Sequence, residues 1–378
     1  EGNWDPFSYD LSKISAVLVT HAHIDHTGLL AKLVRDGYKG KIYSTPPTKA
    51  FANLLFLDSE SILYKEAERM GRPQLYSAED VDQLMSQWEG VEYYRDFNIG
   101  DVKITFYNAG HILGSSIIVI EADGKKIAFT GDLGNNPPHL IKGTDFLENA
   151  DYCVIESAYG DRIHEPVKEG VIENLIEDIA RDKGVLMIPA FAMERTQKIL
   201  YEMHDLFKEK RVPKVPVYLD SPLAIKITEV YKTFKNYFND EAIKSMKTNF
   251  MLFDFPGLEK TLTTEESKNI NLVSAPKVII AGSGMSQGGR ILHHEARYLS
   301  DPKSIILFAG YQTKGSLGRK IKEGQPIVKI HGEDVRVRCR IVSIEGYSAH
   351  ADQPQLLAWI EPMKFNLKKV FVVLIIIY

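Results

Sequence analysis

Cysteine is nearly absent from this sequence: 378 residues contain only Cys153 and Cys339. A disulfide framework needs several paired cysteines, so the small disulfide-stapled folds are excluded. Both cysteines stand in apolar or strand-like surroundings, and we expect two buried free thiols in a reducing compartment. The sequence therefore predicts a cytoplasmic protein.

Long apolar runs are also missing. The longest, at residues 370–378, is too short to cross a bilayer as a helix and predicts a buried strand instead. No signal peptide is visible. We therefore expect no membrane among the partners of this chain.

Neither sign of charge dominates, because 46 Lys and Arg residues against 50 Asp and Glu residues leave a net charge of −4. Such a surface has no general attraction for nucleic acid, so an anionic partner must be held by a local patch or by metal ions. The length suits two domains, and 44% hydrophobic and 25% charged residues are typical of a globular protein.

What the sequence does contain is a dense group of metal-binding side chains. His21, His23, Asp25 and His26 fall within six positions. Imidazole nitrogens and carboxylate oxygens are the ligands that zinc and manganese accept. The spacing predicts two adjacent metal ions, one held by His21 and His23 and the other by Asp25 and His26.

This group lies between a predicted strand and a predicted helix. Residues 14–20 are β-branched and apolar, and residues 28–34 have helical spacing, with Asp25 or Thr27 as the candidate cap. Further strands are predicted at residues 41–45, 102–107, 117–122 and 125–129, and helices at residues 48–70 and 78–88. Because hairpins and helices are mixed, the sequence favours a layered α/β sandwich.

Two more candidate ligands follow predicted strands. His111 stands in a glycine-flanked turn, and Asp132 comes directly after the strand at residues 125–129. A site for two ions needs another imidazole and a carboxylate shared between the ions, and these residues supply both. The alternative for each alone is an ordinary loop residue.

Several motifs resemble a known family. The spacing of residues 21–26, followed by residues 110–111 and 130–132, resembles the metallo-β-lactamase superfamily. The segments around Glu156 and His350 resemble two motifs of its β-CASP branch of nucleases. The resemblance implies an αββα sandwich interrupted by a Rossmann-like α/β insert. It implies these boundaries: residues 1–160 for the first part of the sandwich, 161–348 for the β-CASP domain, and 349–378 for a shortened return to the sandwich.

The same resemblance implies a zinc-dependent phosphodiesterase that cleaves single-stranded RNA, with two Zn²⁺ ions per chain. Asp25 would orient the attacking water or accept its proton, and His350 would donate to the scissile phosphate or the leaving oxygen. Glu156 would orient His350 or a metal ligand. Two alternatives stay open, a non-catalytic RNA-binding scaffold and a DNA-directed nuclease, as do endonucleolytic against exonucleolytic cleavage and a homodimeric assembly.

A glycine-rich loop is the candidate substrate contact. Residues 277–281 predict a buried strand that leads through Ser283, Gly284 and Met285 into a helix N-terminus, an arrangement that binds anions. We expect these three residues to contact a backbone phosphate, with a packing turn as the alternative. The resemblance adds Ser348, two residues before His350, as a fourth substrate contact.

The sequence departs from the family at its C-terminal end. The family places a His-Gly-Glu motif after a strand like residues 370–373, and its histidine completes the second metal site; here Leu374 stands in that place. Leucine cannot bind a metal, so we expect a weakly held or absent second ion, or a sequence that is part of a longer chain. His331 belongs to a similar tripeptide but precedes His350, and we expect it in a hairpin turn.

Overall fold

The computed structural model describes residues 2–138, 140–165, 169–246, 252–344 and 346–373. The chain divides into two compact units. The first comprises Glu1–Ile163, Phe234–Phe238 and Ala349–Ile376, and the second comprises His164–Thr233, Asn239–Ser348 and Ile377–Tyr378. The first unit is thus built from segments that are far apart in the sequence.

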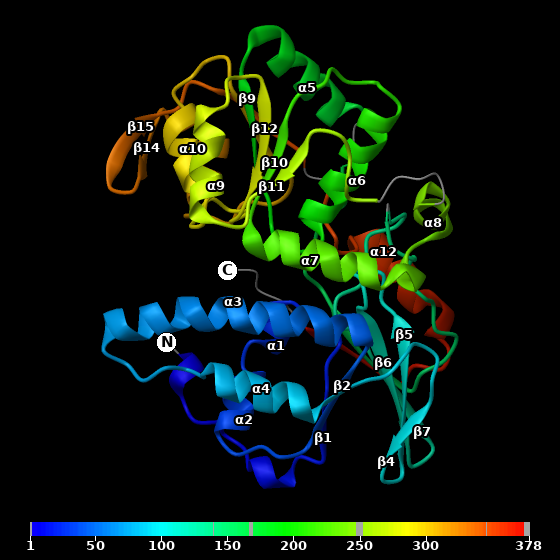
Figure 1. Ribbon diagram of the computed structural model, residues 1–378. Coiled ribbons are helices and arrows are strands. Elements are labelled where there is room, and N and C mark those ends of the chain that lie inside the picture. The colour runs from blue at the N-terminus through cyan, green and yellow to red at the C-terminus, as the bar shows by residue number, and fades with distance from the viewer. Residues whose placement is uncertain (1, 139, 166–168, 247–251, 345, 374–378) are drawn as a thin grey trace. The chain divides into compact units, whose positions relative to one another are not determined.

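The first unit contains two sheets and the helices that cover them (Figure 1). The smaller, parallel sheet has the order β1-β2-β3, formed by Ala16–Leu18, Lys41–Ser44 and Trp88–Gly90. The larger sheet has the order β17-β8-β7-β6-β5-β4, formed by Lys369–Val373, Tyr152–Glu156, Lys125–Phe129, Ser116–Ala122, Val102–Asn108 and Phe97–Ile99. The α-helices are α1 (Ile24–Thr27), α2 (Leu30–Arg35), α3 (Pro46–Met70), α4 (Ala78–Gln87) and α12 (Gln353–Ile360).

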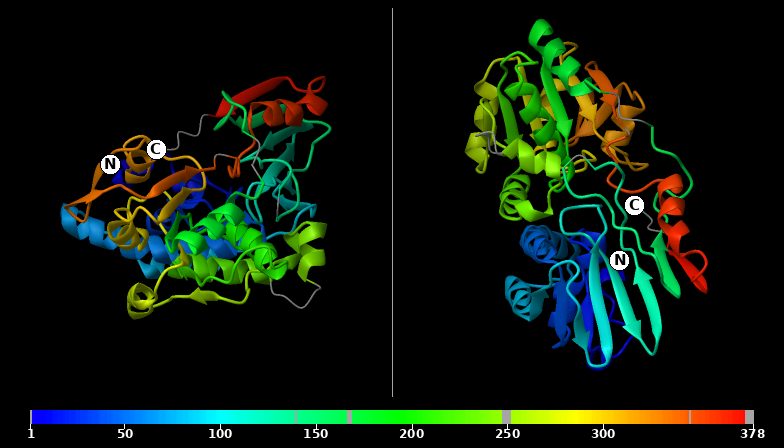
Figure 2. Two further views of the ribbon diagram at one scale, coloured as in Figure 1. Left: turned by 90° about the horizontal axis from the view of Figure 1, so that it is seen from above. Right: turned by 90° about the vertical axis from the view of Figure 1, so that its right-hand side faces the viewer.

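The larger sheet is covered on both faces along its central strands. Its edge strand β17 is exposed at every residue, so the strand predicted from residue 370 onward is confirmed as a strand through Val373 but its predicted burial is wrong. Phe106 and Ile118 on one face belong to a cluster that includes Leu18 and Tyr43 of the smaller sheet. Trp359 of α12 belongs to the cluster on the other face. The antiparallel hairpins of β5, β6 and β7 lie side by side in the right-hand view of Figure 2. Helix, sheet, sheet and helix therefore stack in four layers, and the first unit is an αββα sandwich.

Local sequence sets the ends of the long helix α3. Pro46 and Pro47 follow β2, which ends at Ser44, and occupy the first two helical positions, so α3 begins two residues before the predicted start at residue 48. Proline is favoured there because the missing N–H has no intrahelical partner at a helix start. At the other end Gly71 adopts a left-handed conformation with φ of 63° and closes the helix. The predicted second helix ends one residue early, because Trp88 begins β3.

The second unit is a parallel α/β layer structure. Its sheet has the order β11-β10-β12-β9-β13-β16, formed by Leu258–Lys260, Val217–Asp220, Lys277–Ala281, Val185–Pro189, Ile305–Phe308 and Arg340–Ser343. The helices are α5 (Val171–Asp182), α6 (Arg195–Lys208), α7 (Pro222–Thr233), α8 (Asp240–Met246), α9 (Thr264–Asn269), α10 (Ile291–Tyr298) and α11 (Leu317–Lys322). The expected hairpin turn at His331 is confirmed, because it joins β14 (Ile327–Ile330) to β15 (Glu333–Arg336). None of the helices in the described ranges has the length and apolar character needed to cross a membrane.

A buried carboxyl holds the glycine-rich loop of the second unit. Glu295 on α10 is fully buried, and its Oε1 is hydrogen-bonded to the hydroxyl of Ser286. Its Oε2 has no hydrogen-bond partner among the described residues. Burial raises the pKa of Glu295 to about 8. The folded chain therefore keeps a proton at neutral pH that the unfolded chain releases above a pKa of about 4.3.

Glu295→Gln is expected to stabilise the protein at pH 8. Because the folded carboxyl has the raised pKa, wild-type stability falls as pH rises from the ordinary glutamate range towards 8, and a neutral amide removes that loss. The free energy of unfolding of the variant relative to wild type should be on the order of 3 kcal/mol higher at pH 8 than at pH 5. Urea unfolding at both pH values measures it. The exposed Glu265→Gln is the control, and an equal pH response of the two variants would contradict the assignment.

Candidate metal centre

The candidate ligands lie at the loop ends of the sandwich strands. β1 ends at Leu18 and the chain then runs through His21 and His23 into the single turn of α1. The predicted cap is wrong: Asp25 and Thr27 lie inside α1, and its N-cap is His23, which makes no side-chain cap bond. The helix predicted at residues 28–34 is α2, which begins at Leu30 after the separate turn of α1.

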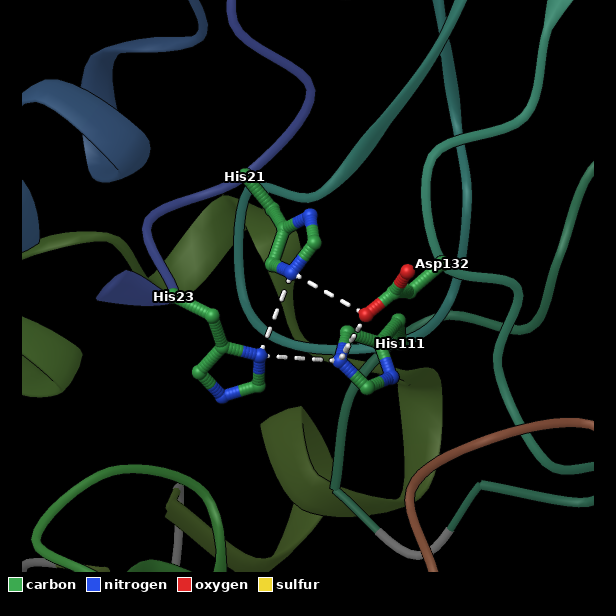
Figure 3. Close-up of side chains that lie close together, drawn as sticks. All are labelled: His21, His23, His111 and Asp132. Atoms are coloured by element: carbon green, nitrogen blue, oxygen red, sulfur yellow. Dashed lines mark hydrogen bonds and ion pairs between the residues drawn. The ribbon is translucent and has the colours of Figure 1, made fainter. Parts of the chain in front are cut away.

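Four side chains converge on one point (Figure 3). Nδ1 of His23 lies 3.1 Å from Nε2 of His21 and 3.1 Å from Nε2 of His111. Oδ2 of Asp132 lies 3.3 Å from His21 Nε2 and 3.5 Å from His111 Nε2. Donor atoms of a tetrahedral zinc site with bonds of 2.0–2.1 Å are about 3.3 Å apart. Four of the six donor–donor distances are close to that value, and all four atoms lie within 4.8 Å of one another, so together they can hold one metal ion.

Backbone contacts fix the imidazole of His111. Its Nδ1 lies 3.2 Å from the carbonyl oxygen of Ala349. Because a carbonyl oxygen can only accept, Nδ1 carries the hydrogen and donates a hydrogen bond to it. The lone pair is then on Nε2, the atom that faces His23 and Asp132. A neutral imidazole with its lone pair directed inward is the form that binds metal.

Asp132 has a second oxygen that is directed away from this cluster. Its Oδ1 is buried and makes no hydrogen bond within the described residues. It lies 3.4 Å from Nε2 of His26, which is in turn 3.6 Å from Oδ2 of Asp25. An unpartnered buried carboxylate oxygen is costly unless a cation satisfies it. Asp132 thus has one oxygen for each of two adjacent sites.

The pKa shifts agree with a cation site. Burial lowers the pKa values of His23 and His111 well below that of free imidazole, so both are neutral and able to bind metal. Burial alone would raise the pKa of Asp132, but the imidazoles of His21 and His26, at 3.3 Å and 3.4 Å, outweigh it and hold this pKa below its usual value. Asp132 is therefore a buried anion beside the neutral imidazoles of His23 and His111.

Glu156 and His350 form a pair beside the cluster. Oε2 of Glu156 lies 3.3 Å from Nδ1 of His350, and Oε1 accepts a hydrogen bond from the backbone N–H of Leu133. Glu156 is 3% exposed. Burial raises its pKa even though His350 opposes the rise. One carboxylate thus holds both His350 and the residue after Asp132.

The remaining predicted residues lie in the second unit or outside the described ranges. The hydroxyl of Ser283 accepts hydrogen bonds from the N–H groups of Gln287 and Gly288, so it is used within the loop itself. Gly284 accepts a hydrogen bond from Gln312 at its carbonyl, the carbonyl of Met285 accepts one from Gly318, and Ser348 is buried. Substrate contact by these four residues stays a prediction. Leu374 lies outside the described residues.

Sequence reasoning missed the backbone groups of the site. The carbonyl of Ala349 that orients His111, and the N–H of Leu133 that holds Glu156, have no signature in side-chain patterns. Tyr159 stands in a recognised motif but received no role, although its ring centroid is 5.7 Å from that of His350. The one signal that could have suggested a role for Tyr159 is its place in the same motif as Glu156.

Two buried imidazoles, a half-buried third and a shared carboxylate at the loop end of an αββα sandwich define a metallo-hydrolase of the metallo-β-lactamase type. Comparison with family models agrees. A metallo-β-lactamase superfamily domain matches residues 3–157, a Beta-Casp domain matches residues 196–321, and a Zn-dependent metallo-hydrolase RNA specificity domain matches residues 334–373. The chain belongs to the β-CASP family of this superfamily.

Relatives are similar over nearly the whole chain. Ribonuclease TTHA0252 of Thermus thermophilus is 37% identical over 95% of this chain and 81% of its own length. The RNase J-like protein of Methanocaldococcus jannaschii is 34% identical over 93% of this chain and 79% of its own length. The transcription termination factor FttA of Methanosarcina mazei is 30% identical over 97% of this chain, which spans 59% of that protein.

Proposed function

We propose that this protein is a zinc-dependent ribonuclease that hydrolyses phosphodiester bonds in single-stranded RNA. The observation that carries the proposal is the convergence of donor atoms from His21, His23, His111 and Asp132 to within 4.8 Å of one another. Relatives named as ribonucleases support RNA as the substrate. We propose the cytoplasm as its compartment and leave a homodimer as the assembly to test.

The proposed ligand set has two parts. His21, His23, His111 and Asp132 would hold the first ion, and Asp25, His26 and Asp132 the second. When bound, the two ions would lower the pKa of a shared water and neutralise charge on the phosphate. Because the second set has only three protein ligands and Leu374 supplies none, we expect the second ion to be held more weakly.

The chain's own residues would position the reacting groups. The carboxylate of Asp25 is 56% exposed and is available to orient the attacking water or accept its proton. Nδ1 of His350 lies 3.3 Å from Oε2 of Glu156, and Nε2 would donate a hydrogen bond or a proton to the phosphate or to the leaving oxygen. Glu156 would act as a positioning residue. Ser283, Gly284, Met285 and Ser348 remain the proposed substrate contacts, and residues 161–348 the proposed β-CASP domain.

Chelation should abolish cleavage, and zinc should restore it. Zinc titrated into stripped protein is expected to bind one equivalent tightly and a second at least about tenfold more weakly, because the second site lacks one ligand. Calorimetry measures both equivalents, and a labelled single-stranded RNA reports cleavage in parallel. RNA binding without cleavage in fully zinc-loaded protein would favour the scaffold function. Cleavage of DNA but not RNA would favour the DNA-directed alternative.

A further inference from the structure

The guanidinium group of Arg162 is separated from His350 by the ring of Tyr159. The ring centroid of Tyr159 is 5.7 Å from that of His350, and the guanidinium carbon of Arg162 is 5.4 Å from the Tyr159 ring centroid. All three residues belong to the first unit. Imidazole, phenol and guanidinium therefore form a short series that leads away from the reacting centre.

The loop that carries this series is firmly held. Gln353, at the start of α12, donates from its side chain to the carbonyl of Gly160 at 2.7 Å and from its backbone to the carbonyl of Arg162 at 3.1 Å. The N–H of Arg162 donates to the carbonyl of Tyr159. Tyr159 and Arg162 are thus placed by backbone contacts that do not depend on their own side chains.

The charged guanidinium group of Arg162 already donates hydrogen bonds from two of its nitrogens. Nε and Nη2 donate to the two carboxylate oxygens of Asp161 at 2.8 Å and 3.2 Å. A phosphate would have to compete with that carboxylate for the same donors. The side chain is nevertheless 50% exposed, so half of its surface, including part of the guanidinium group or its stem, is in contact with solvent. Flat guanidinium faces stack on nucleobases.

We propose that Arg162, backed by Tyr159, is a stacking subsite for one unpaired nucleobase next to the scissile phosphate; this inference rests on the proposed function. A base within a duplex is covered on both faces by its neighbours, so only an unpaired base can stack there. The subsite would give the enzyme its preference for single strands. It would take any of the four bases, because every base has an aromatic face.

The test is a double-mutant cycle in which the Arg162 side chain and single RNA bases are removed separately and together. Metal-free protein is mixed with a labelled single-stranded RNA and with a set of the same RNA that lacks one base at each position in turn, and affinity is measured by fluorescence anisotropy. Wild type should lose about 5- to 50-fold at one position. Arg162→Ala should bind the intact RNA that much more weakly and show no further loss at that position.

Two further variants separate stacking from charge. Arg162→Lys keeps the charge and removes the plane, so it should lose as much affinity as Arg162→Ala. Arg181→Ala is the matched control, because Arg181 makes the same two-bond contact with neighbouring Asp182. It should bind as wild type does.

Contrary results are clearly defined. Full binding by Arg162→Lys, an equal loss in Arg181→Ala, or identical base dependence in wild type and Arg162→Ala would each overturn the stacking subsite. Zinc-loaded wild type is tested for cleavage separately. Absence of cleavage there would overturn the proposed function, while the binding cycle would still show whether Arg162 contacts a base.

Discussion

His23→Ala is expected to lose both the tightly bound metal and RNA cleavage. Nδ1 of His23 lies 3.1 Å from both His21 Nε2 and His111 Nε2, so its removal opens one corner of the donor set. Metal-based stabilisation of a phosphoryl transition state is worth several kcal/mol, and kcat/KM should fall at least about 1000-fold. Mass spectrometry of bound metal and cleavage of labelled RNA measure the two effects.

A histidine outside the site provides the control. His331 lies in the exposed β14–β15 turn with φ of 52°, a conformation that asparagine tolerates. His331→Asn should keep the metal and the activity of wild type. If His23→Ala still cleaved RNA at the wild-type rate, the activity would come from a contaminating nuclease, and the scaffold function would stand.

His350→Ala is expected to lower kcat by about 100- to 10,000-fold while zinc content stays unchanged. His350 is proposed to act on the phosphate or the leaving oxygen rather than on the metal, so KM should change little. Glu156→Gln should cost less, about 10- to 100-fold, because it disturbs the orientation of His350 but leaves the imidazole in place. Steady-state kinetics with metal analysis of each preparation separates the effects.

A different result would reassign His350. Ligand atoms of Asp132, Glu156 and His350 lie within 4.8 Å of one another, so these residues could themselves hold an ion. Loss of zinc from His350→Ala in parallel with activity would make His350 a ligand. Partial recovery of kcat on adding imidazole, with zinc unchanged, would support the proton-donor role.

The sequence was most informative where side-chain type and spacing decide the structure. The β-branched run before His21 forms β1, and the tripeptide at His331 forms a turn. The convergence of His111 and Asp132 on His23 could be predicted because a metal site needs a full set of donors. The buried thiols of Cys153 and Cys339 also follow from their apolar neighbours.

Other features depend on tertiary context. A proline pair after a strand can stand in a loop or begin the next helix, and here Pro46 and Pro47 occupy the first two positions of α3. Asp25 has the chemistry of a cap, but it lies inside α1, with its Oδ2 3.6 Å from Nε2 of His26. The pairing of Glu156 with Leu133 uses a backbone N–H, which any residue would offer. Sequence patterns carry no information on such contacts.

The carbonyl of Ala349 has a consequence for synthesis on the ribosome. It orients His111, and it also accepts a hydrogen bond from the N–H of Asn135, yet it follows the entire inserted segment in the chain. A nascent polypeptide that has emerged only to residue 348 already carries all six proposed metal ligands but lacks this carbonyl and His350. Translation therefore completes the proposed hydrolytic centre only after the inserted segment has been made. Products of premature termination are expected to retain less zinc and to leave cellular transcripts intact, which metal analysis of chains stopped at residues 348 and 363 would test.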